Sequence, residues 1–197
     1  MRDRPAGTVR VWTADIRLIH WSLALSVGAA WLSEAGERLH ERAGWLVLGL
    51  VILRTVIGFV GAPTARFTAF VRGPRAVLAY LADLARGRPT PHLGHNPAGG
   101  AMIVALLAGL AVSAGSGALM VTDRFWGDPL VEALHETSSN LVVLLVPVHV
   151  AGVLVSSLLE RQNLVGAMIT GRKRWPPPDP GGRQSEPVVR LERTARG

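Results

Sequence analysis

Residues 129–160 read PLVEALHETSSNLVVLLVPVHVAGVLVSSLLE, and this apolar stretch determines the expected fold. It predicts one long helix over residues 130–159, with His135 near its start and His149 deep within it. The two histidines are 14 residues apart, which is nearly four whole turns, so both rings leave the same face roughly 21 Å apart along the axis. That distance is most of the roughly 30 Å hydrocarbon core of a bilayer.

The composition is typical of a membrane protein. Apolar residues make up 49% of the 197 residues, charged residues only 18%, and the apolar residues occur in blocks. The chain has no cysteine, which excludes disulfides, zinc-thiolate sites, iron–sulfur clusters and covalently attached c-type haem. The first apolar segment has no small-residue cleavage site, so we expect no cleavable signal peptide.

Four apolar segments predict an all-α fold, an integral membrane four-helix bundle. The predicted membrane spans are residues 16–33, 39–60, 97–122 and 130–159. With their links they form one domain over residues 1–174. Residues 175–197 are basic and rich in proline, as is typical of a disordered tail.

A long loop separates the second and third spans. Gly73-Pro74 begins a short helix in it, since proline suits the first helical position. Its apolar residues recur at helical spacing, which predicts an amphipathic helix on the membrane surface. The third span begins at Asn96-Pro97 and is rich in glycine and serine. Such small residues allow helix backbones to approach closely, and we expect them to favour a homodimer.

The basic residues predict the orientation. The N-terminal region, the long loop and the C-terminal region carry four, five and eight Lys or Arg residues, and the two short links carry three. The positive-inside rule therefore places both termini and the long loop in the cytoplasm. The opposite side is acidic. The net charge of +7 is thus a sign of membrane topology, and we expect no nucleic-acid partner.

This topology brings the histidines together in two pairs. His20 and His149 fall near the cytoplasmic side, and His40 and His135 near the other side. Each pair joins two helices at one depth. Neutral imidazoles from facing helices suit the two axial positions of a haem iron, which favours electron transfer over oxygen chemistry. The sequence therefore predicts two bis-His haems, with irons roughly 21 Å apart.

Some of these histidines also have a simpler interpretation. A single His near an interface is often only an interfacial polar residue, which applies to His40 and His135. A His buried in a span is usually functional, because polar groups are costly there. A zinc site is less favoured, since helical zinc ligands usually stand at i, i+4 with carboxylates nearby, and none of these four has such a neighbour.

Three further residues are candidates for cofactor binding. Arg54 stands alone in the second span, near the depth of His20 and His149. A buried arginine needs an anionic partner, and haem propionates would serve; the alternative is that Arg54 snorkels to the interface. Arg17 is a weaker candidate at the boundary. His95 precedes the third span. It either lines a pocket for quinone or for a haem propionate, or it is a solvated residue of a helix-capping turn.

The chain resembles bacterial cytochrome b561 proteins, and more closely the b-type cytochrome subunits of nickel–iron hydrogenases, over about residues 10–174. The resemblance implies four transmembrane helices, bis-His haem b, and electron exchange with the quinone pool and a partner redox protein in the inner membrane. The matching stretches are Arg17-Leu18-Ile19-His20-Trp21, Leu39-His40-Glu41, Arg54 with Gly58-Phe59-Val60-Gly61, Phe70-Val71-Arg72-Gly73-Pro74, Gly94-His95-Asn96-Pro97, and His135-Glu136 with His149.

We therefore predict a membrane-bound di-haem b-type cytochrome. It would pass single electrons between quinone and a partner such as a hydrogenase or a periplasmic cytochrome c. We expect it to be embedded in the lipid bilayer. Three alternatives remain: a small histidine-containing transporter or metal permease without haem, a non-redox membrane scaffold, and a single-haem protein in which His40 is only interfacial.

Overall fold

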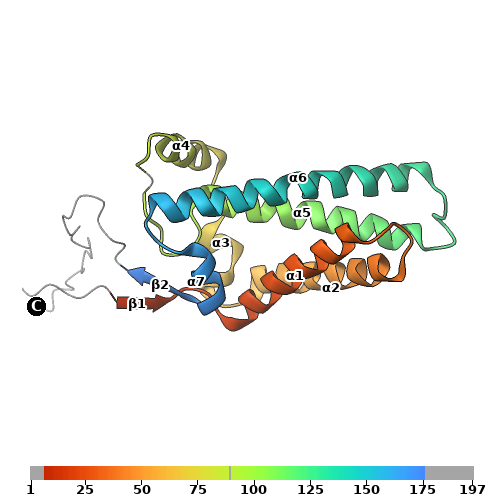
Figure 1. Cartoon of the computed structure of the whole chain (residues 1–197), viewed down its shortest axis with the longest axis horizontal. Coiled ribbons are helices and arrows are strands. Elements are labelled where there is room, and N and C mark those ends of the chain that lie inside the picture. Colours follow the sequence, from red (N-terminus) through yellow and green to blue (C-terminus); the bar gives the residue numbers. More distant parts are fainter. Residues whose placement is uncertain (1–6, 89, 176–197) are drawn as a thin grey trace, which may run out of the picture.

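The computed structural model describes residues 7–88 and 90–175. Four long helices run antiparallel to one another in sequence order (Figure 1). The long helices are α1 (Ala14–Leu32), α2 (Arg38–Val60), α5 (Pro97–Met120) and α6 (Pro129–Leu159). Helix α1 packs against α2, α5 packs against α6, and α2 also packs against α5.

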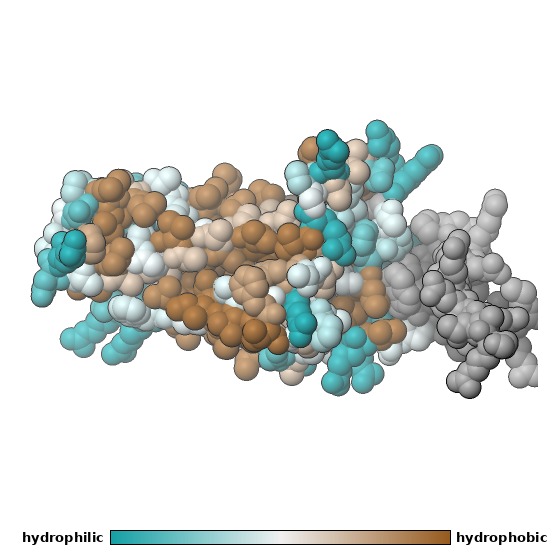
Figure 2. Space-filling view, turned by 180° about the vertical axis from the view of Figure 1, so that it is seen from behind, coloured by the Kyte–Doolittle hydropathy of each residue, from teal (hydrophilic) through white to brown (hydrophobic). Residues whose placement is uncertain are grey.

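These bounds lie within two residues of the predicted spans. Three of the helices, α2, α5 and α6, are long and apolar enough to cross a membrane. Helix α1 is not among them, and Asp15, Arg17 and His20 in its first two turns reduce its hydropathy. Apolar side chains cover the middle of the long helices, and polar side chains gather at both ends (Figure 2). The structure thus supports a membrane protein, and the fourth span stays a prediction.

Capping residues explain where two of the long helices begin. The Asn96 side chain accepts a hydrogen bond from the Gly99 amide at 2.7 Å, and Pro97 follows it at the first helical position. Asp128 accepts from Leu130 and Val131 at 2.9 and 3.2 Å in the same way before α6. These bonds satisfy amide groups that the first helical turn leaves free. The predicted start at Asn96-Pro97 is confirmed.

Small residues allow α5 and α6 to pack closely. A Cβ atom on Gly109 would lie 3.0 Å from a methyl group of Val142. The hydroxyl groups of Ser113 and Ser139 are 2.7 Å apart and join the same two helices. The close approach expected of small residues is therefore present within one chain, and the homodimer stays a prediction.

The long loop contains the predicted short helix, α4 (Pro74–Ala85), which starts at Pro74. Tyr80 is buried on its inner side, whereas Leu78 and Leu81 are 65% and 44% exposed. Two shorter elements that were not predicted, η1 (Pro63–Ala65) and α3 (Phe67–Phe70), connect it to α2. They bring Phe67 and Phe70 close to the end of the helix bundle.

The prediction of a purely helical fold is wrong in one respect. Strand β1 (Gly7–Arg10) pairs antiparallel with β2 (Arg172–Trp175). Helix α7 (Leu164–Thr170) precedes β2 and ends at Gly171, whose φ of +79° suits glycine. The strands are four residues long and far apart in sequence, so no local periodicity indicates them. Regular structure therefore reaches Trp175, and the rest of the predicted tail lies outside the described residues.

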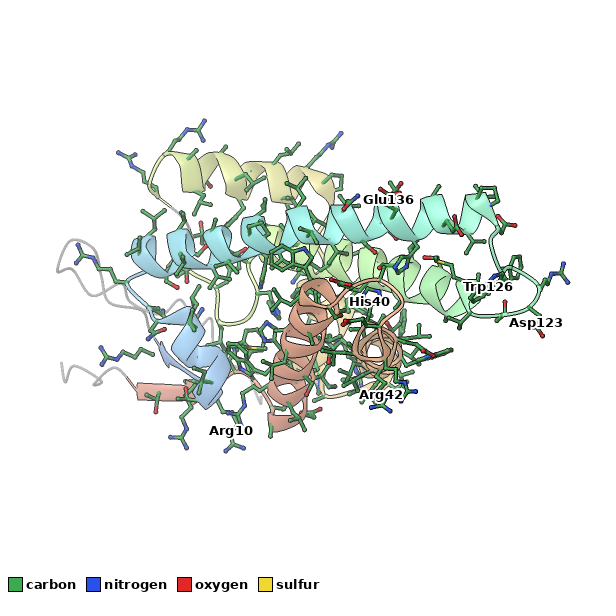
Figure 3. The ribbon with its side chains drawn as sticks, turned by 45° about the vertical axis from the view of Figure 1, so that its right-hand side comes forward. Arg10, His40, Arg42, Asp123, Trp126 and Glu136 are labelled. Atoms are coloured by element: carbon green, nitrogen blue, oxygen red, sulfur yellow. The ribbon has the colours of Figure 1, made fainter. Side chains whose placement is uncertain are left out.

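The bundle has two different ends. The strand end contains β1, β2, α7 and the start of α1, and the link end contains the connections over residues 33–37 and 121–128. Arg10 lies at the strand end, and Asp123 and Trp126 lie at the link end (Figure 3). These two names are used below.

Candidate functional site

The structure brings the four membrane histidines together in two pairs. His20 of α1 and His149 of α6 lie toward the strand end with ring centroids 6.4 Å apart. His40 of α2 and His135 of α6 lie toward the link end with ring centroids 6.2 Å apart. These are the pairs predicted from depth along the helices. Helix α6 contributes one ring to each pair.

Both separations suit two imidazoles that bind one metal ion from opposite sides. An imidazole nitrogen binds a metal at about 2.0 Å, and the ring centroid lies roughly 1.1 Å behind that nitrogen, so two axial rings have centroids about 6.2 Å apart. The observed separations of 6.2 and 6.4 Å are close to this value. The residues present therefore fit axial ligation of haem iron.

Backbone carbonyl groups hold both rings of the link-end pair. The Nδ1 atom of His40 lies 2.9 Å from the Ala30 carbonyl oxygen, and Nδ1 of His135 lies 2.8 Å from that of Ser113. A carbonyl oxygen can only accept, so each Nδ1 carries the proton and donates. Each Nε2 then keeps its lone pair for a metal. A hydrogen bond of this kind commonly orients a metal-binding histidine.

Gly117 makes room for the His135 ring. A Cβ atom at this position would lie 3.0 Å from the ring carbon Cε1 and 3.1 Å from Nδ1. By contrast, a Cβ atom on Gly115, half a turn earlier on α5, would have open space around it. The glycine at 117 therefore allows the ring to lie flat against α5, where Ser113 accepts its proton.

The strand-end pair is held differently. The Nδ1 atom of His20 is buried and has no hydrogen-bond partner among the described residues. Its ring makes an edge contact with Trp21 at a centroid distance of 5.1 Å. On α6, His149 follows Pro147, which lacks an N–H group and therefore leaves the Val143 carbonyl without its helical donor.

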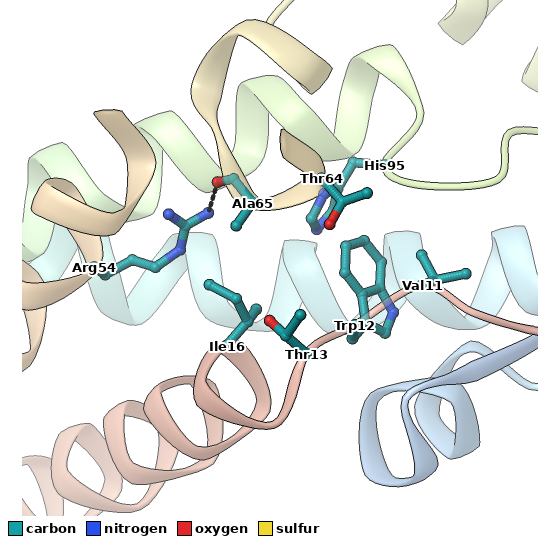
Figure 4. Close-up of a pocket in the computed structure, with 8 residues that line it drawn as sticks. All are labelled: Val11, Trp12, Thr13, Ile16, Arg54, Thr64, Ala65 and His95. Carbon is teal, nitrogen blue, oxygen red and sulfur yellow. Dashed lines mark hydrogen bonds between the residues drawn. The ribbon is translucent and has the colours of Figure 1, made fainter. Parts of the chain in front are cut away.

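A small cavity of about 10 Å³ lies between α1, α2 and the start of α5 (Figure 4). Its volume suits about one water-sized group. Three polar atoms of its lining residues are buried without a hydrogen-bond partner in the described part of the chain. They are Oγ1 of Thr13, Nη1 of Arg54 and Nδ1 of His95. Such orphaned groups usually indicate a bound water, ion or ligand.

Arg54 supplies the positive charge of this cavity. It is only 7% exposed, and Nη2 donates to the Ala65 carbonyl oxygen at 3.3 Å. Its guanidinium carbon lies 5.4 Å from the centre of the Phe67 ring, and Gly58 permits this, because a Cβ atom there would lie 2.1 Å from Phe67. Asp15 is exposed and forms no ion pair with it among the described residues. A buried guanidinium with one free nitrogen favours an anionic oxygen atom as its partner.

His95 is stacked between two aromatic rings. Its ring centroid lies 4.2 Å from that of Trp12 and 4.9 Å from that of Phe70. Burial, followed by the charge of Arg54, lowers the pKa of His95 to about 3. The ring is therefore neutral at physiological pH and can donate or accept one hydrogen bond inside the cavity.

Arg17 has a different position from the one expected of a cofactor residue. Its Nη1 donates to the Ile169 carbonyl oxygen at the end of α7, and it is not among the residues that line the cavity. A Cβ atom on Gly171 would lie 3.3 Å from its Nε atom. Arg17 thus joins α1 to α7, and its contact with a cofactor stays a prediction.

A buried polar cluster at the strand end was not foreseen from the sequence. Glu160 and Lys173 form an ion pair at 3.7 Å, Tyr80 donates to Glu160 at 3.5 Å, and Lys173 donates to the His92 carbonyl oxygen at 2.8 Å. Burial, then the carboxylate of Glu160, raises the pKa of Tyr80 to about 12. Burial also raises the pKa of Glu160 and lowers that of Lys173. The cluster joins α4 to α6 and β2.

Over residues 7–88 and 90–175, no group of three or more His, Cys, Asp or Glu side chains lies close enough to hold a metal ion. The four histidines of the long helices instead form two pairs. Two imidazoles would suit a cofactor that supplies the remaining coordination itself, as a porphyrin does.

Comparison with known proteins gives one result. A family model described as prokaryotic cytochrome b561 matches residues 11–171. No curated protein and no solved structure matches the chain. The matched region contains both histidine pairs and the lining of the small cavity.

Proposed function

Because the chain belongs to the prokaryotic cytochrome b561 family, and is thus a membrane b-type cytochrome in electron transfer, we propose that it binds two haems. Electrons would pass singly between the quinone pool and a partner redox protein. The observation that carries this proposal is the presence of two imidazole pairs with centroid separations of 6.4 and 6.2 Å.

Each histidine pair would hold one haem b. Haem b supplies one-electron redox chemistry when bound. His20 and His149 close the strand-end site, and His40 and His135 close the link-end site. With two histidines as its ligands, each haem iron would have no open position for oxygen, which would favour electron transfer. The backbone hydrogen bonds of His40 and His135 fix the tautomer that leaves Nε2 as the ligand.

One carboxylate oxygen of the strand-end haem would enter the small cavity, whose volume suits about one such atom. Arg54, Thr13 and His95 direct three otherwise unpartnered polar atoms to this cavity, and each can donate a hydrogen bond to a carboxylate oxygen. A propionate group would also neutralise the buried charge of Arg54. In this proposal, His95 donates a hydrogen bond to the haem propionate.

In this proposal, the strand end lies in the cytoplasm. Helix α1 crosses the membrane together with α2, α5 and α6. The described basic residues of the long loop and of β1 and β2 lie at the strand end, in agreement with the positive-inside rule. At the link end, the acidic residues Glu41 and Glu132 are exposed and Asp128 is half-buried. They provide a docking surface for a basic partner, whose electron transfer would weaken at high salt.

Visible spectroscopy of the purified protein tests this function. We expect a reduced-minus-oxidised difference spectrum with b-type α-bands and a pyridine haemochrome assay that gives two haems per chain. A colourless protein would contradict the proposal and favour the transporter or scaffold alternatives. One haem per chain that is retained in His40→Ala would restrict the function to a single-haem cytochrome.

A further inference from the structure

A second and larger cavity adjoins the small one at the strand end. Its volume is about 250 Å³, and it shares Val11, Trp12, Thr64 and His95 with the lining of the small cavity. The shared residues form a wall between the two spaces. The larger cavity is not needed to hold the carboxylate assigned to Arg54, so its lining requires a separate explanation.

The lining of this cavity is basic. Arg10 and Arg72 line it, together with His92 and the neutral ring of His95, and no acidic residue does. Among the described residues, neither arginine forms an ion pair. The nearby carboxylates already have cationic partners, since Glu160 pairs with Lys173 and Asp83 pairs with Arg86. An uncompensated positive field in a cavity favours an anionic ligand.

Two features fix the position of the positive charge. Arg72 donates to the carbonyl oxygens of Thr68 and Ala69 at 3.3 and 3.1 Å, which holds its guanidinium at the end of α3. Pro97, the first residue of α5, also lines the cavity, and a helix N-terminus attracts anions.

The position of the cavity favours a lipid over a soluble anion. Part of its wall is apolar, with Trp12 and Phe70. The neighbouring helix α4 exposes Leu78 and Leu81 on one side, as an amphipathic helix does at the boundary between headgroups and acyl chains. Basic pockets beside membrane helices on the cytoplasmic side commonly bind anionic headgroups.

We propose that this cavity binds the phosphate group of an anionic phospholipid, with Arg10 and Arg72 as its cationic contacts. The headgroup phosphate occupies the basic part, and the acyl chains pass along the apolar wall toward the bilayer. This lipid site is independent of electron transfer. It would fasten the β1–β2 ribbon and the start of α5 to the leaflet at the strand end.

Lipid binding to the holoprotein in a neutral detergent tests the proposal. Native mass spectrometry would measure binding of short-chain phosphatidylglycerol, with phosphatidylcholine of the same chain length and inorganic phosphate as separate arms. We expect phosphatidylglycerol alone to bind tightly, at one molecule per chain. Arg10→Gln should weaken it roughly fivefold, and Arg10→Gln with Arg72→Gln roughly 25-fold, since each basic contact near a lipid surface contributes about 1 kcal/mol.

A matched control removes the same charge elsewhere. Arg75 lies on α4, Arg86 directly follows it, and neither lines the cavity, so Arg75→Gln with Arg86→Gln should bind phosphatidylglycerol as the wild type does. Equal weakening in this control, or unchanged binding in the cavity variants, would overturn the proposal. So would tight binding of inorganic phosphate. Arg10→Lys should restore affinity and thereby exclude a folding defect.

The haem content of the same samples separates this inference from the proposed function. Two haems with no lipid binding would reject only the lipid site. Loss of one haem in Arg10→Gln would also reject it, because the cavity would then belong to the cofactor. Absence of haem in the wild type would contradict the proposed function and leave the lipid result to stand by itself.

Discussion

The link-end and strand-end histidine pairs have similar ring separations and different surroundings. At the link end, His40 and His135 each donate a hydrogen bond to a backbone carbonyl oxygen. At the strand end, Nδ1 of His20 has no partner in the described chain, and the nearby cavity contains a buried arginine. The link-end rings are therefore oriented by the backbone before a ligand arrives, whereas the strand end supplies charge to its ligand.

This difference suggests a division of roles between the two sites. Preorganised ligands bind a metal with little loss of side-chain freedom. A buried cation beside a cofactor instead stabilises the more negative redox state. We expect the link-end haem to be the more firmly bound and the strand-end haem to be the one whose potential depends on a side chain. The predictions below test this comparison.

The largest expected effect is the loss of one haem at a time. His149→Ala should remove the strand-end haem and leave the link-end haem, and His135→Ala should do the reverse, because α6 provides one ligand to each pair. Pyridine haemochrome should give about one haem per chain in each variant, half the wild-type content predicted for bis-His sites. Loss of both haems in either variant would show that the two sites do not assemble independently.

A smaller effect should follow from crowding the His135 ring. Gly117→Ala places a Cβ atom 3.0 Å from that ring, which typically costs about 1–3 kcal/mol when the surroundings cannot move. We expect weaker retention of the link-end haem during dilution, with the strand-end haem unchanged. Gly115→Ala is the control, since its Cβ atom meets nothing within 4 Å. Equal haem loss in both variants would contradict this role of Gly117.

The charge of Arg54 should change the redox equilibrium of one site only. Arg54→Gln removes a buried cation and should lower the strand-end potential by about 59 mV, which is a tenfold shift for one electron. A potentiometric titration would resolve this from the link-end haem, whose potential should not change. Arg54→Lys keeps the charge and should give a smaller shift. Equal shifts at both haems would show that Arg54 acts on the bundle as a whole.

Several parts of this comparison could be predicted from the sequence, and others could not. Hydrophobic length and the Asn96-Pro97 signal predicted the long helices, and the helical rise placed His20 at the level of His149. The hydrogen-bond partners of the rings have no such signal, because backbone carbonyl groups are present at every position. The Thr13 hydroxyl could have been considered, since it begins α1 and makes no capping bond.

The missed elements share one physical cause, which is dependence on contacts between distant residues. The β1–β2 pair joins segments at opposite ends of the described chain. The ion pair of Glu160 and Lys173 exists only because α6 ends beside β2. Strands β1 and β2 have no periodic pattern of their own, so local sequence rules do not detect these contacts. These contacts join the elements of the strand end, near the His20–His149 pair.

The last expected effect concerns acid, and it should also be confined to the strand end. The pKa of His95 is lowered from 6.5 to about 3 in the folded protein, so its neutral form contributes stability that is complete above pH 6.5 and is lost as the pH falls toward 3. At pH 4.5 the cost is roughly 2–3 kcal/mol. Unfolding of the wild type and His95→Gln at pH 7 and 4.5 would measure it, and the variant should lose less stability on acidification. The link-end haem should be retained longer than the strand-end haem in acid. Identical pH dependence in the two proteins would mean that His95 takes up its proton without disturbing the strand end.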